Sequence, residues 1–236
     1  MVLLVSTGLL ALAVLAVVFY YAVAAPGSQW LGQTRVCGDA AGGKIALTFD
    51  DGPGEATPLV LDILQEAGIR ATFFLCGRNT ERFPDYARRI ADEGHEIGNH
   101  TYSHPRLLWK TPGRIAYEID RAQNVIAYRT GHRPKLFRPP YGIRWFGLSA
   151  ILARNDLTAV MWSVNGRDWT PPAERIVDRV LRQARPGSII LLHDGVPPRD
   201  SGNRQATVEA LRQIIHILGG RYRFVTVSEM VGSVTC

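Results

Sequence analysis

The sequence lacks runs of basic residues, internal repeats and low-complexity segments, and these absences narrow the class of protein. The arginines are scattered, and no Lys/Arg run or aromatic stacking platform indicates a nucleic-acid partner. A chain of 236 residues without repeats suits one domain with a substantial core. Basic residues exceed acidic ones by 27 − 21 = 6. This surplus would suit acidic polymers or lipid headgroups, although a solvated surface explains it more simply.

Charge is also absent from the N-terminal segment. Residues 2–25 contain no charged side chain, and the apolar run ends before Pro-Gly-Ser. At about 1.5 Å per residue, such a helix just spans a hydrocarbon core of about 30 Å. Ala22-Val23-Ala24 resembles the small residues before a signal cleavage site, but the run is long for a secretory signal. We therefore interpret residues 1–25 as a transmembrane anchor in preference to a cleaved signal peptide.

The three cysteines occupy separate parts of the chain. Cys37 precedes the first predicted strand, and Cys236 is the final residue. Because the termini of a domain often lie close together, a Cys37–Cys236 disulfide is expected in an oxidising compartment. Cys76 ends an apolar run and is predicted to be a buried core thiol.

Residues 26–43 lack periodicity and are predicted to be a linker, after which β-type runs alternate with helical patterns. The predicted strands are Ile45–Phe49, Thr72–Leu75, Glu96–Asn99, Leu136–Arg138, Thr158–Trp162, Ser188–Leu192 and Tyr222–Thr226. The predicted helices lie near 57–67, 84–93, 113–129, 146–154, 173–184 and 205–218. This alternation predicts a parallel α/β domain over residues 44–236, built as a barrel or a doubly wound sheet. Polar residues at the ends of several different strands favour the barrel.

Two of these strand ends carry groups that bind metals. Asp50 and Asp51 leave the first predicted strand, where carboxylates are costly to desolvate unless they are paired, hydrogen-bonded or metal-bound. Asp-Asp-Gly-Pro alone also suits a turn. His100 and His104 follow the third predicted strand. Residues four apart share one side of a helical turn, so both rings would reach one ion. Neither motif is decisive by itself.

Three further strand ends add polar and aromatic groups. The fourth predicted strand is followed by Arg138 and Tyr141, the fifth by Asp168 and Trp169, and the sixth contains Leu191 and runs into His193. Five strand ends that deliver carboxylates, histidines and an arginine to one edge predict an active site. The residue types indicate a hydrolase with one bound metal ion.

These segments resemble the five motifs of the NodB-homology polysaccharide deacetylases, the fourth carbohydrate esterase family. They are TFDDGP at 48–53, HTYSHP at 100–105, RPPYG at 138–142, RDWTPP at 167–172 and LLHDG at 191–195, in the family's order. The resemblance implies a distorted (β/α)7 barrel of the NodB type. It also implies an enzyme that removes N-acetyl groups from the amino sugars of a polysaccharide and releases acetate.

The resemblance further implies a metal site. A divalent ion, usually zinc and alternatively cobalt or another ion, would be held by Asp51, His100 and His104. These ligands leave open positions for water and a substrate oxygen. By the same resemblance, Asp50 would be the general base that deprotonates the attacking water.

The remaining roles implied by the resemblance concern the leaving group and the pocket walls. His193 would be the general acid that protonates the leaving amine, and the backbone N–H of Tyr141 would help to stabilise the oxyanion. Arg138 would keep the Asp50 carboxylate ionised, and Asp168 would favour the imidazolium form of His193. Leu191 and Trp169 would form apolar walls around the acetyl methyl group.

Several other polar and aromatic residues are predicted to lie outside the site. Asp194 is interpreted as a turn residue that satisfies backbone donors. Packing or surface positions are predicted for His95, His132, His216 and Arg70. Tyr102 and Trp109 are interpreted either as walls of a sugar-binding groove or as local packing, and neither is assigned to the site. Asn99 is interpreted either as a support for the metal-binding histidines or as a local strand-end contact.

Alternatives from other classes remain open. Two histidines and one carboxylate also describe non-haem iron oxygenases, and an inactive carbohydrate-binding domain would keep the fold. The complete set of base, acid and ligands favours the enzyme. We expect peptidoglycan N-acetylglucosamine as the substrate, with chitin oligomers or acetylated xylan as alternatives.

The predicted substrate also determines the expected location. We expect a monomer at the cell membrane, attached through residues 2–25, with its catalytic domain outside the cytoplasm, or a secreted protein if residues 1–25 are cleaved. The Lys/Arg bias alone would place the domain in the cytoplasm.

Overall fold

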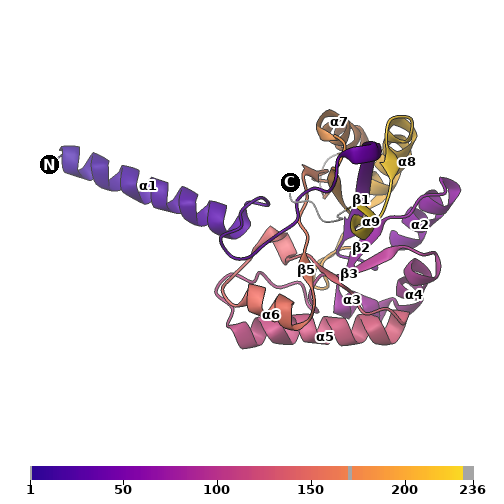
Figure 1. Cartoon of the computed structure of the whole chain (residues 1–236), viewed down its shortest axis with the longest axis horizontal. Coiled ribbons are helices and arrows are strands. Elements are labelled where there is room, and N and C mark those ends of the chain that lie inside the picture. The colour runs from indigo at the N-terminus through magenta and orange to yellow at the C-terminus, as the bar shows by residue number, and fades with distance from the viewer. Residues whose placement is uncertain (1, 170–171, 231–236) are drawn as a thin grey trace.

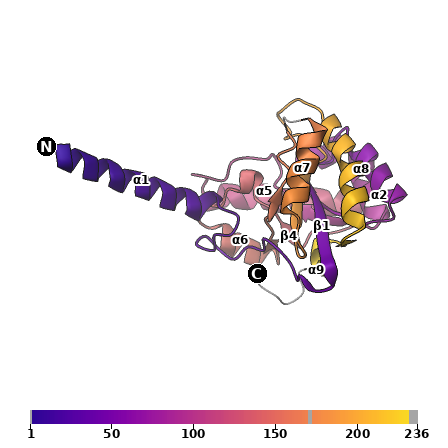
Figure 2. The same ribbon diagram turned by 90° about the horizontal axis from the view of Figure 1, so that it is seen from above.

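The computed structural model describes residues 2–169 and 172–230. Its centre is a parallel sheet covered by helices, from which helix α1 (Val2–Ala24) projects like a rod (Figures 1 and 2). The strands are β1 (Lys44–Asp50), β2 (Thr72–Leu75), β3 (Glu96–Asn99), β4 (Leu136–Phe137), β5 (Thr158–Ala159), β6 (Val164–Asn165), β7 (Ile189–His193) and β8 (Arg223–Phe224). The remaining helices are α2 (Thr57–Glu66), α3 (Gly77–Arg82), α4 (Pro84–Asp92), α5 (Pro112–Thr130), α6 (Leu148–Arg154), α7 (Ala173–Gln183), α8 (Gln205–Gly219) and α9 (Val227–Met230), with short 3₁₀ turns η1 (Ala41–Gly43) and η2 (Pro140–Gly142).

The sheet is parallel but open. Its strand order is β5-β4-β3-β2-β1-β7-β6, and β8 pairs with the start of β1. Within residues 2–169 and 172–230 the two ends of this order, β5 and β6, do not pair. The expected parallel α/β architecture is confirmed, and the predicted distorted (β/α)7 barrel has the form of a half-barrel. The end strands β5 and β6, and β4 beside β5, contain only two residues each, too few to continue the sheet around to closure.

The central strand β1 is buried on both faces, as expected for a parallel sheet covered by helices. Ile45, Leu47 and Phe49 contribute to the main apolar cluster, which includes helices α2, α4, α7 and α8. The alternate residues Ala46 and Thr48 point to the opposite face, because side chains alternate along a strand. Complete burial of a side chain such as Phe49 contributes about 1.5–3 kcal/mol.

The residues predicted to form a linker lie partly against the edge of the sheet. Arg35 makes an isolated parallel bridge with Val160, and its N–H donates to the carbonyl of Ala159 at 2.9 Å. Cys37 makes an antiparallel bridge with Ser188. Val160 belongs to a predicted strand that ends as β5 after Ala159. The Val160 N–H donates to the Phe137 carbonyl of β4 at 2.8 Å, and on its other side Val160 bridges Arg35.

The C-terminal end of α1 packs on the α/β domain. Phe19 stacks on Trp109 with ring centroids 5.9 Å apart, and Val23 joins an apolar cluster with residues of α5 and α6. The buried Arg144 donates hydrogen bonds to the carbonyls of Ala25 and Ser28. These contacts tie the end of α1 to the domain.

The expected transmembrane segment is not confirmed. In the described part of the chain, no helix combines the length and hydropathy needed to cross a membrane. Helix α1 has the predicted position, but its described side chains begin at residue 9.

The cysteine predictions have separate outcomes. Cys76 is a free buried thiol, as predicted, and burial raises its pKa well above the ordinary value. Cys236 lies outside the described residues, so the Cys37–Cys236 disulfide stays a prediction.

Candidate active site

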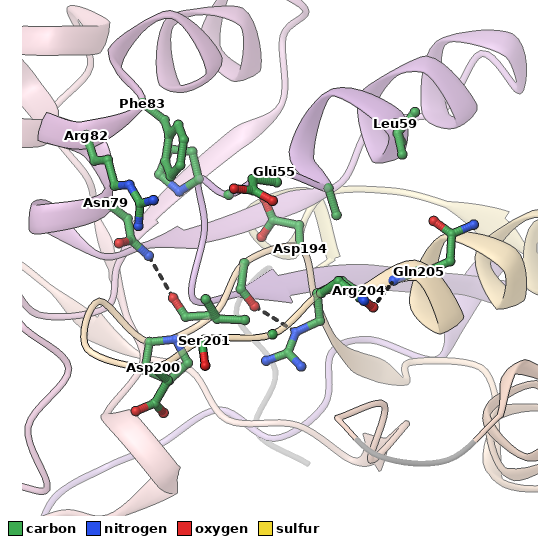
Figure 3. A pocket seen from close by; sticks show the side chains of 18 residues that line it. Glu55, Leu59, Asn79, Arg82, Phe83, Asp194, Asp200, Ser201, Arg204 and Gln205 are labelled. Atoms are coloured by element: carbon green, nitrogen blue, oxygen red, sulfur yellow. Dashed lines mark hydrogen bonds between the residues drawn. The ribbon is translucent and has the colours of Figure 1, made fainter.

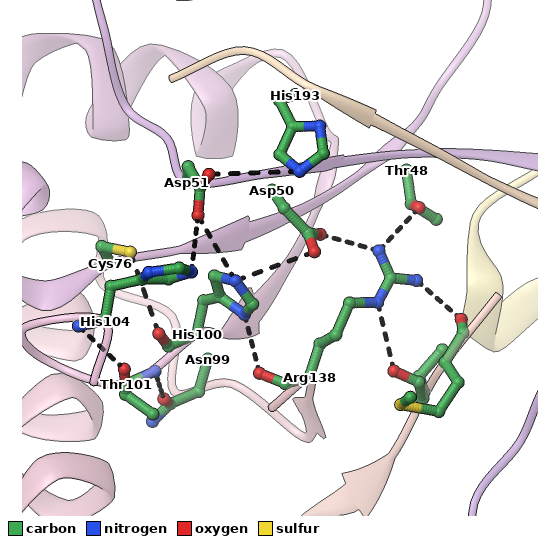
Figure 4. Close-up of polar contacts among 12 residues, drawn as sticks. Thr48, Asp50, Asp51, Cys76, Asn99, His100, Thr101, His104, Arg138 and His193 are labelled. Atoms are coloured by element: carbon green, nitrogen blue, oxygen red, sulfur yellow. Dashed lines mark hydrogen bonds and ion pairs between the residues drawn. The ribbon is translucent and has the colours of Figure 1, made fainter. Parts of the chain in front are cut away.

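The carboxyl ends of the strands meet at one pocket of about 430 Å³. Figure 4 shows the centre of this arrangement, with Asp50 at the end of β1, Asp51 directly after it, the two histidines after β3, Arg138 after β4 and His193 at the end of β7. The lining residues are Asp50, Asp51, His100, His104, Tyr141, Gly142, Trp162, Asn165, Trp169, Leu191, His193, Pro197, Asp200 and Arg204. The predicted edge of the sheet is therefore the location of the pocket. Arg138 and Asp168 lie behind its wall, fully or almost fully buried.

Asp51, His100 and His104 form a buried cluster with the donor set of a metal site. The Asp51 Oδ1 atom lies 3.4 Å from His100 Nε2 and 3.0 Å from His104 Nε2. One ligand atom from each residue lies within 4.8 Å of the other two. Burial raises the pKa of the Asp51 carboxyl, but the two imidazoles outweigh it and hold that pKa well below its usual range. The cluster thus presents an ionised carboxylate between two rings.

The hydrogen bonds around the cluster fit a bound cation. His100 Nδ1 lies 2.7 Å from the carbonyl oxygen of Arg138. An Nδ1–H that donates there leaves the Nε2 lone pair free to bind a metal. Among the described residues, Asp51 Oδ1 has no hydrogen-bond partner although it is buried. A cation between this oxygen and the two Nε2 atoms would satisfy all three donor atoms.

The loop after β3 differs from the predicted helical turn. Thr101 and His104 have left-handed backbones, with φ of 66° and 55°, so the two histidines do not share a helix face. Their rings still converge, with centroids 5.0 Å apart. Asn99 holds this loop, because its Oδ1 accepts a hydrogen bond from the Thr101 N–H at 2.8 Å. Left-handed conformations also occur at Asp51 and Tyr141, and strained backbone of this kind concentrates at functional sites.

Asp50 is paired with the buried Arg138, as Figure 4 shows. The Arg138 guanidinium donates to Asp50 Oδ1 at 2.7 Å and to the Thr48 hydroxyl at 2.8 Å. Two further donations reach the carbonyls of Val160 and Met161. Burial lowers the pKa of Arg138, and Asp50 opposes this effect. The other carboxylate oxygen, Asp50 Oδ2, lies 3.7 Å from His100 Nε2 and therefore faces the metal cluster.

His193 and Asp168 form a second, independent ion pair across the pocket. The Asp168 Oδ1 atom lies 2.7 Å from His193 Nδ1, and Oδ2 accepts hydrogen bonds from the His193 N–H and the Thr207 hydroxyl. Burial lowers the pKa of His193, but Asp168 outweighs it and raises that pKa to about 9. His193 is thus an imidazolium near neutral pH. Its Nε2 atom lies 4.0 Å from Asp51 Oδ2.

The other predicted site residues line the pocket. Leu191 is buried in its floor, and Trp169 lies edge-on to His193 with ring centroids 5.9 Å apart. The Tyr141 ring contacts His104 at 4.6 Å between centroids, and the Arg106 guanidinium lies 4.9 Å from the Tyr141 centroid. The structure therefore brings together all ten predicted residues, eight at the surface of the pocket and two behind it.

A clasp formed by Thr57, Asn79 and Asp194 was not predicted to support the site. Asn79 Nδ2 donates to the carbonyls of Asp51 and Val196 at 2.7 and 2.9 Å, which joins the β1 and β7 loops. Asp194 accepts a hydrogen bond from the Thr57 hydroxyl at 2.5 Å, and burial raises its pKa to about 7. A Cβ atom at residue 52 would lie 2.4 Å from Asp194 Oδ2, so only glycine fits there. The sequence signal for this contact is Gly52 itself.

Most other residues excluded from the predicted site lie outside the pocket. The buried His95 packs on Phe73. The Tyr102 hydroxyl donates to Glu81, and Trp109 contacts the end of α1. Exposed positions are occupied by Arg70, His132 and His216. Trp162, Asn165, Pro197, Asp200 and Arg204 were not predicted to line the pocket.

Comparisons with known proteins agree with this geometry. Residues 38–160 match the family model described as polysaccharide deacetylase. The chain belongs to the polysaccharide deacetylase family. A peptidoglycan-N-acetylglucosamine deacetylase of Bacillus cereus is 41% identical over 190 residues, covering 79% of this chain and 68% of that protein. A chitooligosaccharide deacetylase of Azorhizobium caulinodans is 40% identical over 187 residues, covering 75% of this chain and 89% of that protein.

The fold of this polysaccharide deacetylase is also that of a solved relative. The crystal structure of a peptidoglycan N-acetylglucosamine deacetylase in complex with 4-naphthalen-1-yl-N-oxidanyl-benzamide superposes with a TM-score of 0.80 at 38% identity. The match covers 86% of this chain and 94% of the other. The predicted family, reaction class and NodB-type architecture are thereby confirmed.

Proposed function

We propose that this polysaccharide deacetylase removes N-acetyl groups from N-acetylglucosamine units of peptidoglycan. The observation that carries the proposal is the placement of three charged systems around one pocket. These are the Asp51–His100–His104 cluster, the Asp50–Arg138 pair and the His193–Asp168 pair. A relative named for this substrate covers most of the chain. Chitin oligomers are the second candidate, because another relative is named as a chitooligosaccharide deacetylase.

The three ligands would hold one divalent ion, and we propose Zn²⁺ because two imidazoles and one carboxylate are donors that zinc accepts. Such an ion polarises an acyl oxygen and lowers the pKa of water. Asp50 supplies the base, since Arg138, itself held by the Thr48 hydroxyl, donates to Oδ1 of its carboxylate while Oδ2 faces the cluster. It takes one proton from the attacking water as the new C–O bond forms at the acetyl carbon.

The leaving amine is protonated on the side of the pocket opposite Asp50. The Tyr141 N–H would donate to the oxyanion that develops on the acetyl group. The His193 imidazolium gives a proton to the amide nitrogen, the C–N bond breaks, and acetate and a free amine result. Asp168 maintains the proton on His193 until that step. Leu191 and Trp169 form the apolar surface against which a methyl group would pack.

The reaction is tested by acetate release. Purified protein would be incubated with peptidoglycan, chitin oligomers and acetylated xylan, with and without a chelator, and acetate and oxygen uptake would be measured. We expect chelator-sensitive acetate release, fastest on peptidoglycan, without oxygen uptake. Oxygen uptake would favour an iron oxygenase, and bound metal without acetate release would favour an inactive binding domain. Metal analysis of the active protein identifies the ion.

We further propose that the domain acts outside the cytoplasm, where the proposed polymer lies, as a monomer. One chain supplies the base, the acid and the three metal ligands around this pocket. Cell fractionation with protease treatment of intact cells tests the location, and distinguishes membrane-held from released protein. Light scattering of purified protein tests the oligomeric state.

A further inference from the structure

A second pocket adjoins the catalytic pocket. It has a volume of about 410 Å³ and lies between the turn after β1, the end of α3 and the loop that joins β7 to α8 (Figure 3). Pro197, Asp200 and Arg204 line both pockets, so the two share a wall. We call this second space the side pocket. A polymer whose acetyl group occupies the catalytic pocket would bring its neighbouring groups close to the side pocket.

The side pocket is lined by charged side chains of both signs. Glu55, Arg82, Asp200 and Arg204 line it, as seen in Figure 3. Within the described part of the chain, none of these four forms a salt bridge. Unpaired charges beside a cavity are available to a ligand.

The two arginines are positioned by contacts with the pocket walls. Arg204 Nε donates to the carbonyl of Gly195 at 2.7 Å, which leaves its two terminal nitrogens for another acceptor. The Arg82 guanidinium lies 4.9 Å from the centroid of the Phe83 ring, a cation–π geometry that limits its freedom. Arginine forks of this kind bind carboxylates with two parallel hydrogen bonds. Glu55 and Asp200 supply the complementary charge for an amine.

A neutral sugar offers no charged group to this set of side chains, whereas a short peptide offers carboxylates and an amine. We propose that the side pocket binds the peptide substituent of a sugar that neighbours the deacetylated unit. Arg82 and Arg204 contact its carboxylates, and Glu55 and Asp200 contact its amine. This inference rests on the proposed peptidoglycan deacetylase function and adds that the enzyme recognises the peptide as well as the glycan.

The test compares peptide-bearing glycan strands with the same strands after an amidase has removed their peptides. Wild-type protein is expected to have the higher kcat/KM on peptide-bearing strands. In Arg82→Gln and, separately, Glu55→Gln, the ratio of the two kcat/KM values is expected to fall about tenfold, mainly through KM, as the loss of one charge-assisted contact predicts. Matched controls are Arg182→Gln and Glu174→Gln, exposed positions on α7 that line neither pocket. Their ratios should equal that of the wild type.

Two results would overturn the inference in different ways. If the wild type releases acetate and the ratio is unchanged in both variants, the side pocket does not recognise the peptide, while the proposed function stands. If the wild type releases no acetate from any N-acetylglucosamine polymer, the proposed function and this inference both fail. Thermal denaturation of each variant distinguishes a local effect from a loss of fold.

Discussion

The catalytic pocket has a metal side, formed by Asp51, His100 and His104, and an acid side, formed by His193 and Asp168. The buried polar atoms of the two sides differ in their hydrogen-bond partners. On the metal side, Asp51 Oδ1 and His104 Nδ1 are buried and have no hydrogen-bond partner among the described residues. On the acid side, both oxygens of Asp168 are hydrogen-bonded, to the ring and backbone of His193 and to Thr207. The acid side is complete with protein groups alone, whereas the metal side has a buried acceptor that a cation would satisfy.

An Asp–His contact therefore has two functions in this pocket, proton transfer on one side and metal binding on the other. A carboxylate that meets one imidazole and a hydroxyl favours the protonated ring and holds a proton for transfer. A carboxylate that meets two imidazoles, with Nε2 of His100 turned toward it, provides converging lone pairs for an ion. Asp50 lies between the two sides, where its partner is an arginine that does not give up its proton.

The largest predicted effect comes from breaking the metal side. His104→Ala removes one of three ligands, so bound metal and activity should both be lost, with kcat/KM reduced by about 10³-fold or more. Metal content by mass spectrometry and acetate release provide the measurement. The matched control, His216→Ala, changes an exposed histidine on α8 and should retain both. Full metal content in His104→Ala would disprove the assigned ligand.

The second prediction removes the base but leaves the ligands in place. Asp50→Asn should reduce kcat by about 10²- to 10⁴-fold, the usual contribution of a general base, while metal content stays near that of the wild type. The amide keeps an oxygen that can accept a hydrogen bond from Arg138. Acetate release and metal analysis on the same sample provide the measurement. Near-normal turnover would remove Asp50 from its proposed role.

The third prediction weakens the acid side. Asp168 raises the pKa of His193 to about 9 from 6.5, so Asp168→Asn should lower that pKa and move the alkaline limb of the pH–rate profile to lower pH. The acid form exists only below the pKa, so activity should fall most above neutrality. An unchanged alkaline limb would show that another group donates the proton.

The same pair also predicts the pH dependence of stability. Because the folded-state pKa of His193 is raised, its stabilisation is fully present below pH 6.5 and is lost as pH rises through about 9. Urea denaturation of metal-free protein across this range should show the loss in wild type and a smaller loss in Asp168→Asn. Equal slopes for the two proteins would contradict the linkage.

The smallest predicted effect concerns the contact that joins the β1 and β7 loops. Asn79→Ala leaves the Asp51 and Val196 carbonyls without this donor, which should lower the free energy of unfolding by about 1–3 kcal/mol and reduce kcat modestly. Asn124→Ala, on the exposed face of α5, is the matched control and should change stability by less than about 0.5 kcal/mol. Equal stability of the two variants would show that the Asn79 hydrogen bonds do not stabilise the contact between the β1 and β7 loops.

The sequence by itself determined the family and the chemistry. Each motif is a short contiguous segment at the end of a strand, and parallel strands place those ends at one edge. Asp50, Asp51 and His193 could therefore be assigned to one pocket without coordinates. Their separate roles came from the resemblance to the NodB-homology motifs, because Asp50 and Asp51 are the same residue type and only their places in the motif distinguish them.

Only the tertiary structure decided the open sheet, the loop geometry and the side pocket. Closure of the sheet into a barrel depends on pairing between short strands that are distant in sequence. The local alternation of strand and helix patterns does not encode that pairing. His100 and His104 converge through left-handed backbone, not through a helical turn. Glu55, Arg82 and Arg204 belong to three separate segments, and no spacing along the chain connects them. Their proximity follows from how the loops pack, since nonlocal contacts depend on the whole fold.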